Sequence, residues 1–246
     1  MVLRHDDRGV LAIGQASHAW LSGQLARAWG NDRFPALEPH EEVCLAAEQH
    51  DVGMAAWDLA PTRNPDTGLP LGFTEMPIGT HMQLWRAGPE RLITQSRYAA
   101  LLVAMHGRRL YEMRDRTRMA PDEADQVRAF LSDSRTFEKT LRQSLAVSEH
   151  QIQRNSDLIW TWDFLSLALC LDWAPCTAKA VPTANGPEDL RLNADGSLNP
   201  WPFKAEALTV RAEGRRLSER YATDEELAAA LTNARWETVA FELRRA

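Results

Sequence analysis

The stretch Leu45-Ala-Ala-Glu-Gln-His50-Asp51-Val-Gly53 ends an apolar pattern with an adjacent histidine and aspartate. Its helical spacing predicts an amphipathic helix over about 40–51, with one stripe formed by Val43, Ala46, Ala47 and His50. Gly53 is placed to end that helix. A histidine and an aspartate on a core-facing stripe require partners, because buried polar groups without partners cost free energy. A metal ion would satisfy both, since imidazole and carboxylate are ligands of Zn²⁺, Fe and Mn²⁺.

The composition is that of an ordinary globular protein, and the 246 residues can bury a sizeable core. A formal net charge of −6 without a basic block disfavours nucleic acid and anionic membranes as partners. The chain has no apolar run of about 18 residues and no signal-peptide pattern at its start. Its three cysteines form neither a disulfide framework nor a zinc-finger spacing, so we expect the protein to be located in the reducing cytoplasm.

Further candidate ligands fall on the apolar stripes of other predicted helices. His18 lies on a helix at about 16–29, His81 on one at about 77–87, and His106 on one that starts at Pro89. A long helix is predicted from Pro121 to near 150. Residues 156–173 form the most apolar segment, a helix buried nearly all round, in which Asp163 needs a partner. Taken singly, each histidine also fits a core residue with a backbone partner, and Asp163 fits a salt bridge to an arginine.

Both ends of the chain predict β structure. A turn at 6–9 between two apolar runs indicates a hairpin over 1–15. After Ala174 the alternating residues are Leu208/Val210, Leu217/Glu219/Tyr221 and Val239/Phe241/Leu243. We therefore predict a mainly α fold, in which an all-α bundle over 16–173 binds the metal and a small antiparallel β-rich segment over 174–246 packs on it.

The candidate ligands occupy the stripes of five different predicted helices: His18, His50, Asp51, His81, His106 and Asp163. Ionisable residues at core positions are rare, so finding one on the apolar stripe of each of five helices is more informative than any one of these residues alone. Packing the stripes together would bring the six side chains to one place. The sequence therefore predicts one centre holding one or two divalent ions, with Zn, Fe and Mn left open.

These residues resemble the HD superfamily of metal-dependent phosphohydrolases. His18, the pair in Gln-His50-Asp51-Val-Gly, and Asp163 in Trp-Asp-Phe-Leu-Ser match its His…His-Asp…Asp pattern over about 16–173. The resemblance implies an HD-like helical bundle. His81 and His106 resemble a six-ligand, two-metal branch that includes cyclic-dinucleotide phosphodiesterases and di-iron oxygenases of inositol and aminophosphonate metabolism. The wider sequence, including Trp57-Asp58-Leu-Ala-Pro61 and His106-Gly-Arg-Arg-Leu-Tyr, looks like a bacterial family of unknown function.

The sequence also departs from the HD pattern. Many relatives carry a lysine directly after His-Asp-x-Gly, whereas this chain has Met54, which argues against lysine-assisted chemistry. The Gly-Tyr-Pro motif of the cyclic-dinucleotide enzymes is missing after the His-Asp helix. A cyclic dinucleotide is therefore not expected as the substrate.

The expected function is hydrolysis of a phosphate ester or nucleotide-like small molecule by a metal-activated water, with His50 and Asp51 at the catalytic centre. The turn-rich segment 52–76 follows this pair directly and is expected to border the site. Arg63 and Arg109 are candidates to bind phosphate, although each also fits an ion-paired surface arginine. Trp57 is a further substrate-binding candidate, and Asp58 is expected to orient a ligand histidine.

Two other functions fit the same residues. Histidine and carboxylate ligands also suit iron, so a di-iron oxygenase of a small polar substrate is an alternative. A non-catalytic ligand-binding protein is the other, although buried ionisable groups without a role are a stability liability. The sequence does not decide whether the chain forms a homodimer.

Overall fold

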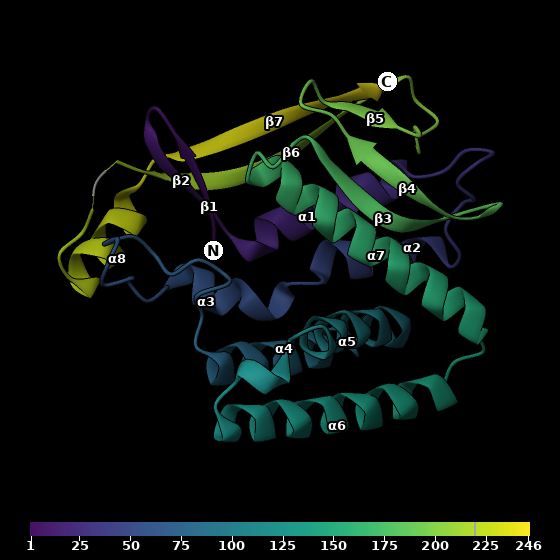
Figure 1. Ribbon diagram of the computed structural model, residues 1–246, viewed down its shortest axis with the longest axis horizontal. Coiled ribbons are helices and arrows are strands. Elements are labelled where there is room, and N and C mark those ends of the chain that lie inside the picture. The colour runs from purple at the N-terminus through teal and green to yellow at the C-terminus, as the bar shows by residue number, and fades with distance from the viewer. Residues whose placement is uncertain (219) are drawn as a thin grey trace.

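The structure is a computed structural model that describes residues 1–218 and 220–246. Figure 1 shows a curled sheet above a layer of helices. In chain order the elements are β1 (Val2–Asp6), β2 (Gly9–Ile13), α1 (Gln15–Ala28), α2 (His40–Gln49), η1 (Val52–Met54), α3 (Ala55–Leu59), α4 (Ile78–Leu92), α5 (Arg97–Glu112), η2 (Arg116–Arg118), α6 (Pro121–Gln143), α7 (Glu149–Cys170), β3 (Cys176–Thr183), β4 (Gly186–Leu192), β5 (Ser197–Asn199), β6 (Ala207–Leu217), α8 (Asp224–Asn233) and β7 (Trp236–Arg245).

The predicted mainly α fold is wrong, and so is the all-α description. About 49% of the chain is helical and 22% lies in strands, in an α/β fold whose sheet curls into a half-barrel. Within the described residues the sheet has seven strands in the order β1-β2-β6-β7-β5-β4-β3. It is mixed rather than antiparallel, because Ser197 and Leu198 of β5 pair in parallel with Arg244 and Arg245 of β7.

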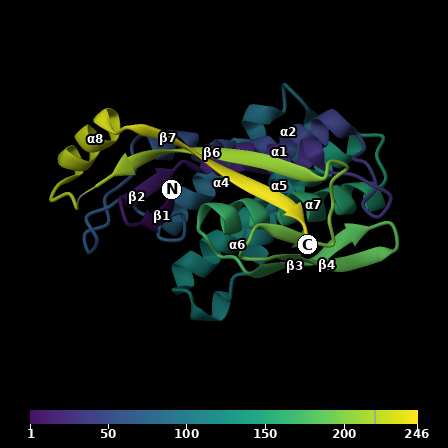
Figure 2. The same cartoon turned by 90° about the horizontal axis from the view of Figure 1, so that it is seen from above.

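The sheet joins strands that are far apart in the sequence. β1 and β2 form an antiparallel hairpin, and β2 also pairs with β6 through Val10 and Leu217. β6 pairs along nearly its whole length with β7, and Figure 2 shows these two strands side by side with α8 at one end. Glu219, part of one predicted alternation, lies outside the described residues.

Helices α1 and α7 lie against the concave side of the sheet, and one hydrophobic core joins them to it. Trp162 of α7 is fully buried, and its ring meets Trp29 edge-on at 5.6 Å between centroids. Trp29 meets Phe203 in the same way at 5.8 Å. α6 lies at the lower edge of Figure 1 and packs against α5 and α4.

Two predicted helix boundaries are wrong. Pro89 does not start a helix but lies inside α4, which continues to Leu92 because the buried Pro89 and Leu92 pack in its core-facing stripe. α5 begins after Ser96, whose side chain caps it by accepting from the Ala99 N–H. The long helix predicted from Pro121 to near 150 ends earlier, at Gln143. A new helix, α7, begins at Glu149, because the Ser148 side chain caps it by accepting from the Gln151 N–H.

Gly53 does not end the His-Asp helix as predicted. α2 ends at Gln49 with His50 as its C-cap, and Gly53 lies one turn later in η1. Its φ is not in the left-handed region, so no turn requires a glycine there. A Cβ at this position would overlap the carbonyl oxygen of Leu84 in α4. Gly53 therefore permits the close contact between η1 and α4.

No helix in the described part of the chain combines the length and the apolar character needed to cross a membrane.

Candidate metal centre

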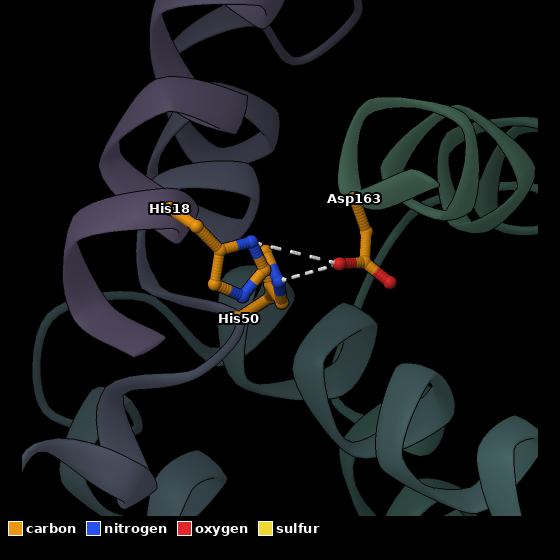
Figure 3. Close-up of side chains that lie close together, drawn as sticks. All are labelled: His18, His50 and Asp163. Atoms are coloured by element: carbon orange, nitrogen blue, oxygen red, sulfur yellow. Dashed lines mark ion pairs between the residues drawn. The ribbon is translucent and has the colours of Figure 1, made fainter. Parts of the chain in front are cut away.

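His18, His50 and Asp163 come from three elements that pack against one another. His18 lies in α1, His50 caps α2 and Asp163 lies in α7, and α1 contacts both of the other helices. Figure 3 shows the three side chains pointing toward one another. One potential ligand atom from each lies within 4.8 Å of the others. Periodicity placed each residue on a core-facing stripe, and the packing of the helices brings them together.

The distances in this group are compatible with one ion. His50 Nε2 lies 3.3 Å from Asp163 Oδ1 and 3.7 Å from Asp51 Oδ2. Two ligand atoms that are each about 2.1 Å from a tetrahedral ion are about 3.4 Å apart. His50 Nδ1 donates to the Ala47 carbonyl at 2.8 Å, and the buried Nε2 has no hydrogen-bond partner within the described residues. In its neutral form, an imidazole held in this way directs the lone pair of Nε2 into the site, so these residues fit a metal ion that displaces the proton.

The contact between His18 and Asp51 is a second indication that this group of side chains binds a cation. His18 Nδ1 lies 2.9 Å from Ser166 Oγ, whose own hydrogen is directed to the Asp163 carbonyl at 2.9 Å. With its hydrogen directed in this way, Ser166 accepts from the Nδ1–H of His18. The other ring nitrogen, Nε2, faces Asp51 Oδ2 at 2.6 Å. A lone pair and a carboxylate face each other at that distance only with a proton or a metal ion to join them.

His106 lies at the edge of this group. Its Nε2 is 3.5 Å from Asp163 Oδ2, and its buried Nδ1 has no hydrogen-bond partner in the described part of the chain. The ring lies between Trp85 and Trp160, at 5.6 Å and 5.5 Å between centroids. His106 is thus close enough to contact whatever Asp163 binds.

His81, expected as a ligand, has both ring nitrogens in hydrogen bonds. Trp85 Nε1 donates to its Nε2 at 3.0 Å, which leaves Nδ1 to donate to the Tyr111 hydroxyl at 2.7 Å. The residue lines the same cavity as His106 and Asp163. In this arrangement it contributes to the wall of the site and offers no free lone pair to a second ion.

The charges of the centre are coupled. Burial by itself lowers the pKa of His50, but Asp51 and Asp163 outweigh it and raise that pKa to about 9. Burial raises the pKa of each carboxyl, yet His50 and His18 hold the pKa of Asp51 and of Asp163 below its ordinary value. Burial lowers the pKa of His106 to about 4. Burial and then Arg114 lower the pKa of His81 to about 4.

The raised pKa of His50 makes the stability of the metal-free protein depend on pH. An unfolded histidine titrates near about 6.5, so the stabilisation is complete below that pH and is lost as the pH rises through about 9. We expect the free energy of unfolding to fall by up to about 3 kcal/mol between pH 6.5 and 9.5. Urea unfolding of chelator-treated protein across this range measures it. The His50→Gln variant should lose this dependence, and a flat profile in the unsubstituted protein would contradict the assignment.

A cavity of about 170 Å³ opens beside the centre. The described residues that line it are Gln15, His18, Asp51, Phe73, Thr74, His81, Trp85, His106, Leu110, Arg114, Asp163 and Leu167. Of these, Arg114 is a cation that the sequence interpretation missed. The signal was present, because Arg114 follows His106 and Leu110 at intervals of four residues.

Three predicted substrate-binding residues lie elsewhere. Arg109 donates to Asp157 at 2.7 Å and covers the ring of Trp160. Arg63 contacts the Tyr221 carbonyl. Trp57 packs against an apolar cluster that includes Met54 and Trp85, and it does not line the cavity. The segment 52–76 reaches the cavity through Phe73 and Thr74 instead.

Asp58, expected to orient a ligand histidine, has other partners. It accepts from the backbone N–H of Gln15, at the start of the helix that carries His18, and it lies 3.6 Å from the amino group of Met1. Burial, offset in part by that amino group, raises the pKa of Asp58. Its contact with the centre is therefore through the position of α1.

The sequence matches the family described as Protein of unknown function (DUF3891) over residues 1–219. The matched range includes the whole centre and its cavity and stops before α8 and β7. No curated protein and no solved structure matches the chain significantly.

Proposed function

The chain belongs to the DUF3891 family, and we propose that it is a metal-dependent hydrolase of small phosphate esters with one divalent ion in an HD-type centre. The observation that carries this proposal is His50 Nε2, a buried ring nitrogen that lies near two carboxylates and has no hydrogen-bond partner among the described residues. His50 and the three residues near it, His18, Asp51 and Asp163, are those that match the HD pattern.

The side chains have distinct roles in this proposal. His18, His50, Asp51 and Asp163 would hold the ion, and Ser166 and the Ala47 carbonyl keep the two imidazoles in the required tautomer. A divalent ion in such a site lowers the pKa of a bound water towards neutrality and polarises a phosphoryl oxygen. His106 faces the cavity beside Asp163, and its lowered pKa keeps it neutral at physiological pH. It can therefore donate or accept one hydrogen bond to a substrate oxygen.

A two-metal oxygenase has less support. It needs a second set of ligands, and both ring nitrogens of His81 are hydrogen-bonded to Trp85 and Tyr111. Among residues 1–218 and 220–246, the group of three potential ligands that lie close enough to share an ion is His18, His50 and Asp163. A single ion with a hydrolytic role agrees better with these contacts.

The test is phosphate release by protein stripped of metal and reloaded separately with Zn²⁺, Mn²⁺ or Fe²⁺. We expect hydrolysis of short phosphomonoesters with at least one ion, and a loss of more than about 100-fold in the Asp51→Asn variant. Asp133→Asn is the control, because it makes the same chemical change in an exposed residue of α6. Protein that binds the ion and releases no phosphate from any ester would refute the proposed reaction.

A further inference from the structure

Arg114 lines the same cavity as the metal ligands His18, Asp51 and Asp163 and has no acidic partner in the described part of the chain. We propose that it binds a second anionic group of the substrate, so that the substrate is a short-chain molecule with a phosphate at the metal end and a carboxylate or second phosphate at the Arg114 end. This inference rests on the proposed function and defines its substrate class.

The guanidinium of Arg114 is available and held in place. The neighbouring arginines of α5 are already neutralised, since Arg108 lies 2.6 Å from Glu138 and Arg109 lies 2.7 Å from Asp157. Arg114 instead lies over the ring of Tyr111, 4.7 Å from its centroid. Tyr111 is fully buried and bonded to His81, so the surface beneath the guanidinium is rigid. An arginine ordered without an acid can bind a carboxylate or phosphate through two parallel hydrogen bonds.

The cavity lining combines polar and apolar side chains. His106 lies within α5, whereas Arg114 lies two residues beyond the end of that helix at Glu112. The apolar residues Leu110, Phe73 and Trp85 line the same cavity. A ligand that contacts both the metal ion and Arg114 therefore has polar groups at its termini and a short apolar chain in the middle.

The size and the charge of the cavity restrict the class of substrate further. At about 170 Å³ the cavity is smaller than the roughly 300–1,000 Å³ of sites that enclose drug-sized ligands. The nucleotide-like substrate allowed by the sequence is therefore disfavoured. A divalent ion would balance the charges of Asp51 and Asp163, and Arg114 adds a positive charge that favours a ligand with more than one negative group.

The test compares non-hydrolysable ligands by calorimetry on Zn²⁺-loaded protein. Each ω-phosphonocarboxylate with one to four methylene groups is paired with the alkylphosphonate of the same length. We expect at least one of the carboxylates to bind about 10–100-fold more tightly than its alkyl partner. Arg114→Gln should remove that difference while changing the affinity for the alkylphosphonate less than about 2-fold. Arg114→Lys, which keeps the charge without the planar fork, should retain part of the difference.

Arg118→Gln is the matched control, because it removes the same charge from an exposed residue nearby, and we expect it to change neither affinity. Thermal melts show that each variant is folded. Equal affinities for every pair in the unsubstituted protein, or an equal loss for both members of a pair in Arg114→Gln, would overturn the inference. Arg114-dependent binding without phosphate release would refute only the proposed hydrolysis. Hydrolysis of simple esters that is insensitive to Arg114 would refute only the second anchor.

Discussion

Replacing Asp163 with asparagine is expected to weaken divalent metal binding by more than about 100-fold, because removing even an outer hydrogen-bond partner of a ligand costs about 10–100-fold. Asp163 contacts two of the histidines, with one oxygen 3.3 Å from His50 Nε2 and the other 3.5 Å from His106 Nε2. Its lowered pKa keeps it ionised at neutral pH. Asparagine keeps the size of the side chain but carries no charge. Competition against a chromogenic chelator measures the affinity.

Asp157→Asn is the control for this substitution. Asp157 lies on the same helix but pairs with Arg109 outside the cavity, so its removal should leave the metal affinity unchanged. Circular dichroism shows that both variants are folded. If Asp163→Asn binds metal within a few-fold of the unsubstituted protein, Asp163 is not a ligand and the centre described above is wrong.

Gly53→Ala is expected to lower the free energy of unfolding by about 3 kcal/mol, at the upper end of the cost of overpacking. The added Cβ would overlap the Leu84 carbonyl oxygen and lie 3.2 Å from the Gly88 nitrogen. Both neighbours are backbone atoms of α4, so relief requires the helix to move away from η1. For a chain of this size the melting temperature should fall by about 6–12 °C.

Gly79→Ala provides the comparison, because it makes the same change in α4. At this position a Cβ would meet only Gln126 Oε1, at 3.5 Å, and alanine favours the helix by up to about 1 kcal/mol. We therefore expect Gly79→Ala to be neutral or stabilising. Equal melting temperatures for the two variants would show that η1 and α4 are not in close contact.

Local periodicity was enough to identify the buried faces of the helices. His18, His50 and Asp51 are buried, and Asp163 is nearly so, because a helix repeats its core-facing position every three to four residues whatever packs against it. The sequence therefore placed these residues on one side of their helices before any neighbour was known. Their role as metal ligands stays a prediction.

Strand pairing depends on residues that are distant in the chain, and sequence patterns did not determine it. β5 has only three residues and too short an alternation to detect, yet it joins β7 in parallel and makes the sheet mixed. The hairpin strand β2 pairs with β6 about 200 residues later, and no local pattern specifies the register of this pairing. These contacts turned a predicted helical protein with a β appendage into an α/β fold.

Sequence patterns also did not determine which partners the individual side chains of the site contact. His81 lies on the predicted stripe, but Trp85 and Tyr111 occupy both of its ring nitrogens. Arg63 was predicted to bind the substrate and Arg114 was not, yet of these two arginines only Arg114 lines the cavity. The sequence by itself determined which residues face inward, because that depends on local backbone geometry. Only the tertiary structure decided which atoms they meet, because hydrogen-bond partners and close contacts come from segments whose relative placement depends on the packing of the whole core.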